Sequence, residues 1–276
     1  MAQQERAIRT RQKIVLAAAE LFDEVGYEAA TISEVLKKCG VTKGALYFHF
    51  SSKEELAQEV LAGQVGALPP VPQRELYLQQ LTDEALVLAH LLRVGDPMVR
   101  GSIRLTVEQG SLHDGLDRQV PMRGWIDHNI AVLNGAKGAG ELLPHVDIAS
   151  AATLFTGSFT GVQMLSKIMT GHADMVDRVA DLMRTLLSAI AVPGVLVRLD
   201  FEPPRAERAY EEALRARTEG AAADGVASTA ATVPSVSAAS SAATVPSSSA
   251  ATSAATSNTS TTSATSSTAS TASTSG

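Results

Sequence analysis

The segment VTKGALYFHF, residues 41–50, combines a lysine, a glycine, three aromatic side chains and a histidine. On a helix that advances about 100° per residue, Ala45 and Leu46 fall on one face and four other residues share the opposite face. These four are Lys43, Gly44, Tyr47 and Phe48. A cation and a hydroxyl can bind phosphate, a glycine allows close backbone approach, and an exposed ring can contact thymine methyl groups. The face therefore suits a DNA groove, although aromatic clusters near helix ends usually belong to a core.

The elements around this segment decide between the two interpretations. A helical pattern of apolar residues ends at Gly26, and TISE then offers Thr31 and Glu34 as a reciprocal capping pair for a second helix. Thr42 is placed to cap a third helix directly after the turn at Gly40, and Ser52 with Glu55 opens a fourth. A short helix, a tight glycine turn and another short helix predict a helix-turn-helix over about residues 31–50.

Helical spacing continues through the rest of the chain, and alternating strand patterns are absent. We therefore expect an all-α protein: a DNA-binding domain over residues 1–66 and a helical bundle over residues 67–218. The bundle helices are expected near residues 74–93, from Asp96 onward, and at 125–136, 148–169, 175–190 and 204–218. Residues 219–276 are almost entirely small or hydroxyl-bearing, so we expect a disordered tail.

Charge and cysteine content exclude several classes of protein. The net charge is −6, but the segment up to Lys53 is mildly basic, which permits a few placed phosphate contacts and argues against indiscriminate coating of nucleic acid. A single cysteine, Cys39, excludes an internal disulfide and is expected in the core. The polar N-terminus does not resemble a signal peptide, and the uncharged run at residues 148–166 holds too many polar groups for a membrane span. We expect a cytoplasmic protein with no membrane partner.

Signals for catalysis or metal binding are weak. The six histidines show no metal-ligand spacing such as HExxH. GSFTG at Gly157 lacks a serine-centred nucleophile, and GAKGAG at Gly135 lacks the Gly-Lys-Ser/Thr ending of a phosphate loop. An enzyme acting on small molecules is therefore an unfavoured alternative, and we expect no catalytic residue, no metal and no cofactor.

The uncharged run at residues 148–166 instead suggests a ligand cavity. Thr156, Thr160 and Gln163 share a face that Gly157 and Gly161 interrupt, so it offers small apolar volume and a few hydrogen-bonding groups. Ligand pockets are mostly apolar with a few placed polar atoms. The expected ligand is small, neutral and amphipathic, because this helix supplies no carboxylate or cation. The alternative, that small residues only permit close helix packing, fits the sequence equally well.

The segment from Arg11 to Leu56, with AAAELFDEVGYEAATISEV followed by GVTKGALYFHFSSKEEL, resembles the DNA-binding domain of TetR-type transcriptional regulators. The resemblance implies an all-helical homodimer whose second domain binds a small molecule and dimerises through two helices. Matched position by position, it places Thr42, Lys43, Tyr47, His49 and Lys53 against DNA and puts Phe48 in a variable slot that can read bases. With Gly44 these residues form the expected DNA-binding set.

Within that family the chain is similar to the γ-butyrolactone autoregulator receptors of antibiotic-producing bacteria. The similar segments are VTKGALYFHF, MAQQERAIRTRQKI, ELLPHVD from Glu141 and AIAVPGVL from Ala189. A lone tryptophan is ordinarily core, but in these receptors a tryptophan matching Trp125 lines the ligand pocket. The expected ligand-binding residues are therefore Trp125 and Thr160, with Gln64 third, and the expected effector is a γ-butyrolactone or butenolide.

The implied function is a repressor that the effector releases from its operator, controlling antibiotic production or differentiation. Two recognition helices fit successive major grooves only when they stand about 34 Å apart, so a ligand that changes their separation would lower operator affinity. We expect the fourth helix to join the DNA-binding helices to the pocket. The remaining alternative is a pseudo-receptor of the same fold that responds to antibiotics or to no ligand.

Overall fold

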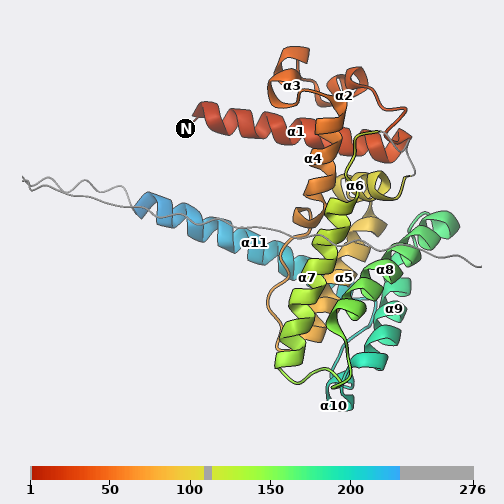
Figure 1. Ribbon diagram of the computed structural model, residues 1–276. Helices are drawn as coiled ribbons and strands as arrows, with labels where there is room; N and C mark the ends of the chain where they lie inside the picture. Colours follow the sequence, from red (N-terminus) through yellow and green to blue (C-terminus); the bar gives the residue numbers. More distant parts are fainter. Residues whose placement is uncertain (1, 109–113, 231–276) are drawn as a thin grey trace, which may run out of the picture. The chain divides into compact units, whose positions relative to one another are not determined.

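The computed structural model describes residues 2–108 and 114–230 of the chain (Figure 1). Within these ranges every regular element is an α-helix, which confirms the all-α prediction, and one isolated bridge pairs Leu142 with Ala191. The helices are α1 (Ala2–Val25), α2 (Ile32–Cys39), α3 (Lys43–His49), α4 (Lys53–Gly66), α5 (Tyr77–Val94), α6 (Pro97–Val107), α7 (Gln119–Gly138), α8 (Ile148–Thr170), α9 (Met175–Ile190), α10 (Pro193–Leu196) and α11 (Arg205–Ala230).

Local capping signals fix the starts of the short N-terminal helices. Thr31 and Glu34 form the predicted capping box, and Gly40 ends α2 in the left-handed conformation at φ 65°. The Thr42 hydroxyl accepts a hydrogen bond from Ala45 N at 3.2 Å and so caps α3. Ser52 caps α4 as predicted, but the carboxylate of Glu55 bonds Ser51 rather than Ser52. These contacts confirm a helix-turn-helix over α2 and α3.

Two hydrophobic clusters divide the described core. The first joins α1 to α4 and includes the predicted core residue Cys39, and the second fills the bundle from α5 onward. Leu105 of α6 belongs to the first cluster, so the two halves share an element rather than meeting at a linker. Residues Met1–Ala231 accordingly pack as one compact unit, and the division at residue 66 stays a prediction.

Gly101 of α6 packs directly against the backbone of α1. A Cβ atom at this position would lie 2.2 Å from the carbonyl oxygen of Ala19 in α1, which no side-chain movement relieves. We expect Gly101→Ala to lower the free energy of unfolding by about 1–3 kcal/mol, because the helices must separate. Urea denaturation measures the change. Gly138→Ala is the matched control, since a Cβ there meets nothing within 4 Å; an equal effect of both substitutions would contradict the close-packing explanation.

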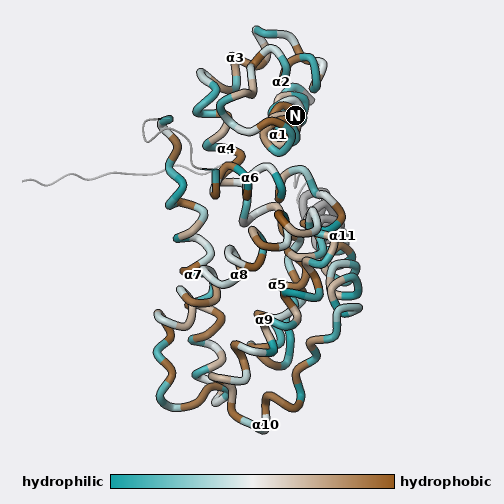
Figure 2. Tube along the Cα trace, turned by 90° about the vertical axis from the view of Figure 1, so that its right-hand side faces the viewer, coloured by the Kyte–Doolittle hydropathy of each residue, from teal (hydrophilic) through white to brown (hydrophobic). Residues whose placement is uncertain are grey.

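The bundle helices α5, α7, α8 and α9 run side by side, and each alternates hydrophobic and hydrophilic stretches along its length (Figure 2). The α5 helix was expected to begin near residue 74 but begins at Tyr77. The reason is a distant cap: the buried carboxylate of Glu141 accepts hydrogen bonds from the backbone N–H groups of Tyr77 and Leu78, both at 2.9 Å. Arg74 instead forms an ion pair with the buried Asp83.

Helix α1 begins at Ala2 and so includes the basic residues Arg6 and Arg9. Two other helix boundaries differ from the sequence-based expectation. The α7 helix begins at Gln119, before Trp125. The α11 helix was expected to end near residue 218 but continues to Ala230, over a segment where alanine favours a helix. The rest of the expected disordered tail, residues 231–276, lies outside the described residues.

Candidate DNA-binding face and ligand cavity

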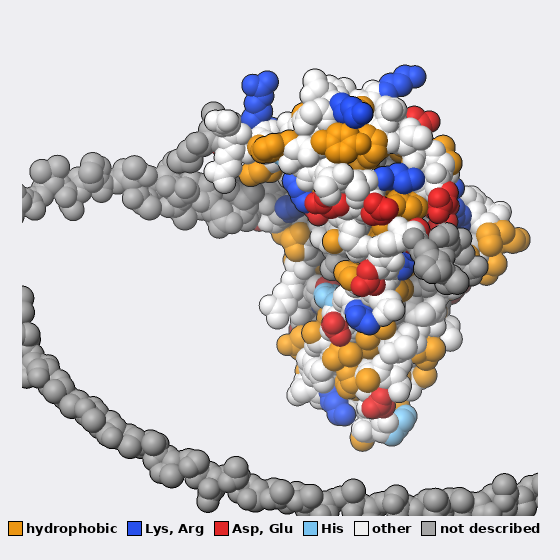
Figure 3. Space-filling view, turned by 45° about the horizontal axis from the view of Figure 1, so that its top comes forward, with side chains coloured by type: hydrophobic (Ala, Val, Ile, Leu, Met, Phe, Trp, Pro, Cys, Tyr) orange, Lys and Arg blue, Asp and Glu red, His pale blue; other side chains and the backbone are white. Residues whose placement is uncertain are grey.

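The α3 helix presents the face that the sequence predicts. Lys43, Gly44, Tyr47 and Phe48 are exposed, whereas Leu46 is fully buried and anchors the helix. The exposed fraction is 79% for Phe48 and 45% for Tyr47, so two aromatic rings stand in solvent beside a lysine. Figure 3 shows the end of the molecule that carries α2 and α3, where separate basic side chains lie among hydrophobic, uncharged and some acidic ones. Such a mixed surface fits groove contacts better than unselective charge attraction.

Lys43 is available for phosphate. Its ammonium lies 5.8 Å from the centroid of the Tyr47 ring, and no carboxylate of the described residues pairs with it. Thr42 uses its hydroxyl oxygen as an acceptor for the α3 cap, so its hydroxyl proton remains free to donate. Lysine, tyrosine and threonine therefore lie together at the start and along the outer face of one helix.

His49 and Lys53 are both partly buried, and their contacts with DNA stay predictions. His49 is half-buried, with ring centroids 5.1 Å from Phe48 and 6.4 Å from Phe50. The Lys53 ammonium donates to the carbonyl oxygens of Tyr27 at 2.9 Å and Ala30 at 3.1 Å. It therefore holds the loop between α1 and α2, and its contact with phosphate stays a prediction. The partners of Lys53 are more than twenty residues away in the sequence, so local pattern could not reveal them.

A cavity lies inside the bundle, and all three expected ligand-binding residues line it: Trp125, Thr160 and Gln64. It encloses about 740 Å³ of empty space, including its opening to solvent. Its wall is mostly apolar and comes from α4 to α9. The other lining residues are Leu81, Glu84, Ala85, Leu88, Ile103, Thr106, Val107, Met122, His128, Asn129, Phe155, Thr156, Phe159, Gln163, Leu182 and Met183.

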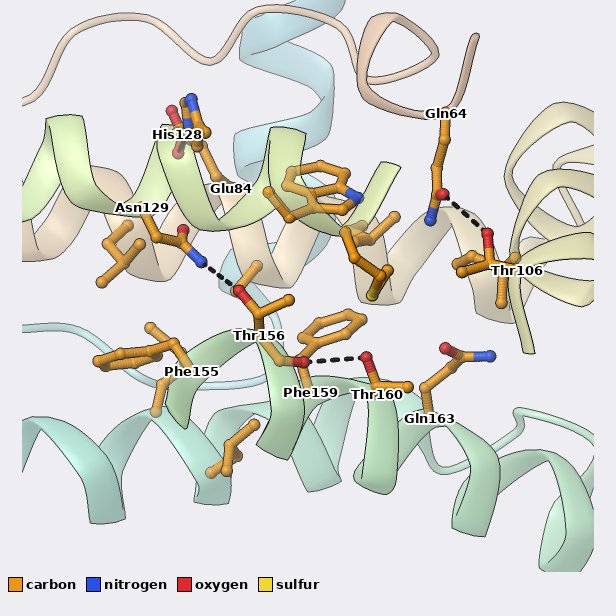
Figure 4. Close-up of a pocket in the computed structure, with 18 of the residues that line it drawn as sticks. Gln64, Glu84, Thr106, His128, Asn129, Phe155, Thr156, Phe159, Thr160 and Gln163 are labelled. Carbon is orange, nitrogen blue, oxygen red and sulfur yellow. Dashed lines mark hydrogen bonds and ion pairs between the residues drawn. The ribbon is translucent and has the colours of Figure 1, made fainter. Parts of the chain in front are cut away.

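The polar groups of the cavity gather at two ends (Figure 4). Gln64, Thr106 and Gln163 lie at one end, where the Thr106 hydroxyl donates to Gln64 Oε1 at 3.3 Å. Asn129 lies at the other end, near Glu84 and His128. Thr160 sits between them with its hydroxyl bonded to the carbonyl oxygen of its own helix at Thr156. The cavity thus offers hydrogen-bonding groups at each end and a mostly apolar middle that contains the already bonded hydroxyl of Thr160.

Glu84 and His128 form an ion pair in the cavity wall that the sequence did not reveal. Nε2 of His128 lies 2.7 Å from the Glu84 carboxylate, which raises the pKa of the imidazole despite its partial burial. Gln80 donates to the other carboxylate oxygen at 2.8 Å. The lack of charged groups expected for residues 148–166 does not extend to α5 and α7, which contribute Glu84 and His128 to the wall. The two residues are 44 positions apart in the sequence, which explains why no local motif marked them.

Two helices connect the cavity to the DNA-binding helices, rather than α4 alone. In α6, Thr106 lines the cavity, while its neighbours Arg104 and Glu108 bond the end of α1. Arg104 donates to the carbonyl oxygen of Asp23, and the Glu108 carboxylate accepts from Tyr27 N at 3.1 Å. A change in the cavity can therefore act on α1 through α6 as well as through α4. A helix-turn-helix connected in this way to an internal cavity defines the class of ligand-regulated DNA-binding proteins.

Comparison with known proteins identifies the family. A family model of bacterial regulatory proteins of the tetR family matches residues 14–60. Over 241 residues the chain is 39% identical to the A-factor receptor protein of Streptomyces griseus, an alignment that covers 84% of each chain. The chain belongs to the tetR family. It is a ligand-responsive transcriptional regulator, which also confirms that it is not an enzyme.

Solved structures extend the similarity to the whole bundle. The crystal structure of full-length native TylP, a TetR regulator from Streptomyces fradiae, is 58% identical, with a TM-score of 0.73, and the match covers 75% of this chain and 99% of that one. A crystal structure of a γ-butyrolactone receptor described as ArpA-like is 27% identical, with a TM-score of 0.55, and covers 75% and 99%. These matches confirm the resemblance to γ-butyrolactone receptors.

Two findings bear on other partners. No helix among residues 2–108 and 114–230 combines the length and apolar character that spanning a bilayer requires. Across the same ranges, no group of histidine, cysteine and acidic side chains is arranged to hold a metal ion.

Proposed function

We propose that the chain is a cytoplasmic repressor that binds its operator as a homodimer and is released by a γ-butyrolactone-type molecule. Its targets would be genes of antibiotic production or differentiation, and it would need no cofactor. The proposal depends mainly on the cavity lined by α4 to α9, because α4 and α6 connect this apolar space to the DNA-binding helices. The similarity to the A-factor receptor and to a γ-butyrolactone receptor supports the ligand class.

The proposed ligand contacts are Trp125, Thr160 and Gln64. Trp125 supplies a broad ring for an aliphatic chain, and its ring lies edge-on to His128, with centroids 6.3 Å apart. The mostly apolar wall with a few polar side chains favours a small amphipathic molecule. The seven residues proposed to contact DNA are Thr42, Lys43, Gly44, Tyr47, Phe48, His49 and Lys53, of which Lys53 has the additional role of holding the loop after α1.

The outward face of α8 supports the proposed dimer. Leu154, Leu165 and Ile168 are exposed along it, and Ile168 is 73% exposed. Gly157 and Gly161 lie on the same face, and a Cβ at either position would meet nothing within 4 Å, so a second helix could approach closely. Large apolar side chains that share one exposed face usually mark an interface. Sedimentation of the purified chain would test the dimer, and a monomer at micromolar concentration would contradict it.

Release would follow if the ligand binds more tightly to one arrangement of the two DNA-binding domains of the dimer than to the other. A shift of the population from 1:99 to 99:1 requires about 5.5 kcal/mol of differential binding. A ligand held against α4 and α6 is placed to supply that preference, because both helices contact the DNA-binding core.

Replacing Trp125 with alanine tests the proposal. We expect operator affinity to change by less than about twofold, while the γ-butyrolactone concentration needed for half-maximal release rises about 100-fold, since a lost aromatic contact costs several kcal/mol. Gel shifts with increasing ligand measure both quantities, and Trp125→Phe, which keeps a ring, is the control. Unchanged release by the alanine variant would exclude the cavity as the site. Failure of every γ-butyrolactone to release the wild-type chain would favour the pseudo-receptor alternative.

A further inference from the structure

The two polar ends of the cavity differ in how well their groups are satisfied. At the end near α4, Gln64 is 2% exposed and Gln163 is 3% exposed. The only hydrogen bond of the Gln64 amide within the described residues is the one that Oε1 accepts from Thr106, and the Gln163 amide has none there (Figure 4). Both residues line the cavity, and their amide N–H groups have no protein acceptor among the described residues, so this end has free donors for hydrogen bonds with a ligand.

The opposite end is already paired and more exposed. The Glu84 carboxylate bonds His128 and Gln80, and Asn129 Nδ2 donates to the Thr156 hydroxyl at 3.1 Å. The side chain of His128 is about one-third exposed, which leaves this end in contact with water. A ligand group that lies here therefore meets groups that are already paired, and it replaces water.

We infer that a ligand binds with its oxygen-bearing head between Gln64 of α4 and Gln163 of α8, and with its chain directed past Trp125 toward the Glu84–His128 pair. This inference rests on the proposed function and adds the orientation of the ligand in the same cavity. The amide N–H groups of both glutamines donate to the ring carbonyl oxygen, and Phe159 and Trp125 line the path of the chain. Gln163 is thereby a specificity-determining residue for the head.

The orientation also gives a route to the DNA-binding helices. Gln64 lies in the last turn of α4, and its amide partner Thr106 lies in α6 next to Arg104. A head that accepts from the Nε2–H group of Gln64 leaves Oε1 free to keep its hydrogen bond from Thr106. Through this one amide the ligand is therefore linked to both helices that reach the first core cluster.

A pair of probes and a pair of variants test the orientation. The probes are a γ-butyrolactone with an alkyl chain and the matching cyclic ether, in which a CH₂ group replaces the ring carbonyl. Binding is followed by fluorescence of Trp125, the only tryptophan of the chain, and release by gel shift. We expect the wild-type chain to bind the lactone at least about tenfold more tightly than the ether, because the ether leaves buried donors unpaired.

The variant Gln163→Leu should bind the two probes about equally, since the donor that distinguishes them is gone. Asn129→Leu is the matched control at the opposite end: it removes an amide of the same kind and should keep the preference for the lactone. Gln64→Leu repeats the test from α4, and circular dichroism checks that each variant folds. The opposite pattern, with the preference lost in Asn129→Leu and kept in Gln163→Leu and Gln64→Leu, would overturn the orientation. Binding of neither probe to the wild-type chain would instead overturn the ligand class proposed above.

Discussion

Replacing Lys43 with alanine should lower operator affinity about 100-fold or more and leave the circular dichroism spectrum unchanged. Lys43 is exposed on α3 without a carboxylate partner among the described residues, so its positive charge is available to a phosphate. The loss of one charged contact costs a factor of about ten, and the proposed dimer would lose two. Because α3 is anchored by Leu46 and capped by Thr42, the substitution removes no contact that holds the helix.

Footprinting and gel shifts at several salt concentrations measure this effect. The slope of log affinity against log salt should become less steep in Lys43→Ala, because fewer counterions are released on binding. Lys137→Ala, at the end of α7, removes the same charge far from α3 in the sequence and should leave both affinity and slope unchanged. Equal affinity of Lys43→Ala and the wild-type chain would exclude α3 as the recognition helix.

The caps of α2 and α3 could be predicted from the sequence because they depend on contacts between residues that are close in the chain. Thr31 bonds Glu34 and Thr42 bonds Ala45, each three residues away, so the caps could be located from residue types and spacing alone. The outer face of α3 followed in the same way, because helical periodicity is a local property. The end of α11 was expected near residue 218 and lies at Ala230, because alanine, the strongest helix former, extends the helix.

The groups that complete the site depend on contacts between distant residues. Lys53 reaches carbonyl groups of the loop after α1, and Glu84 meets His128 across two helices. Glu141 caps a helix that begins more than sixty residues before it. No periodicity or motif records such pairs, because they arise only when the helices pack. The family resemblance located the cavity through Trp125, but the ion pair in its wall and the unpaired amide of Gln163 required the structure.

Asp83→Ala should cause the largest loss of stability of any single substitution considered, about 3–5 kcal/mol in the free energy of unfolding. Asp83 is fully buried, and its carboxylate forms an ion pair with Arg74 at 2.6 Å. It also accepts hydrogen bonds from Nε and Nη2 of Arg205 and from the amide of Gln79, the last at 2.8 Å. Removing the carboxylate leaves two guanidinium groups near one another without their shared counter-charge, and breaking a buried pair costs this much.

The same network explains where the loss should appear. Arg74 precedes α5 and Arg205 begins α11, so Asp83 holds both segments on the bundle, and Arg205 also pairs with Asp200. Urea denaturation at fixed protein concentration measures the change. Asp181→Ala, which removes a largely exposed carboxylate paired with Arg184, is the control and should leave stability nearly unchanged. If Asp83→Ala proved as stable as this control, the buried network would not be what fixes α11 against α5. If Asp83→Ala instead unfolds at lower urea concentration, the molecules that remain folded should bind the operator as tightly as the wild-type chain does. The reason is that no atom of the network reaches α3.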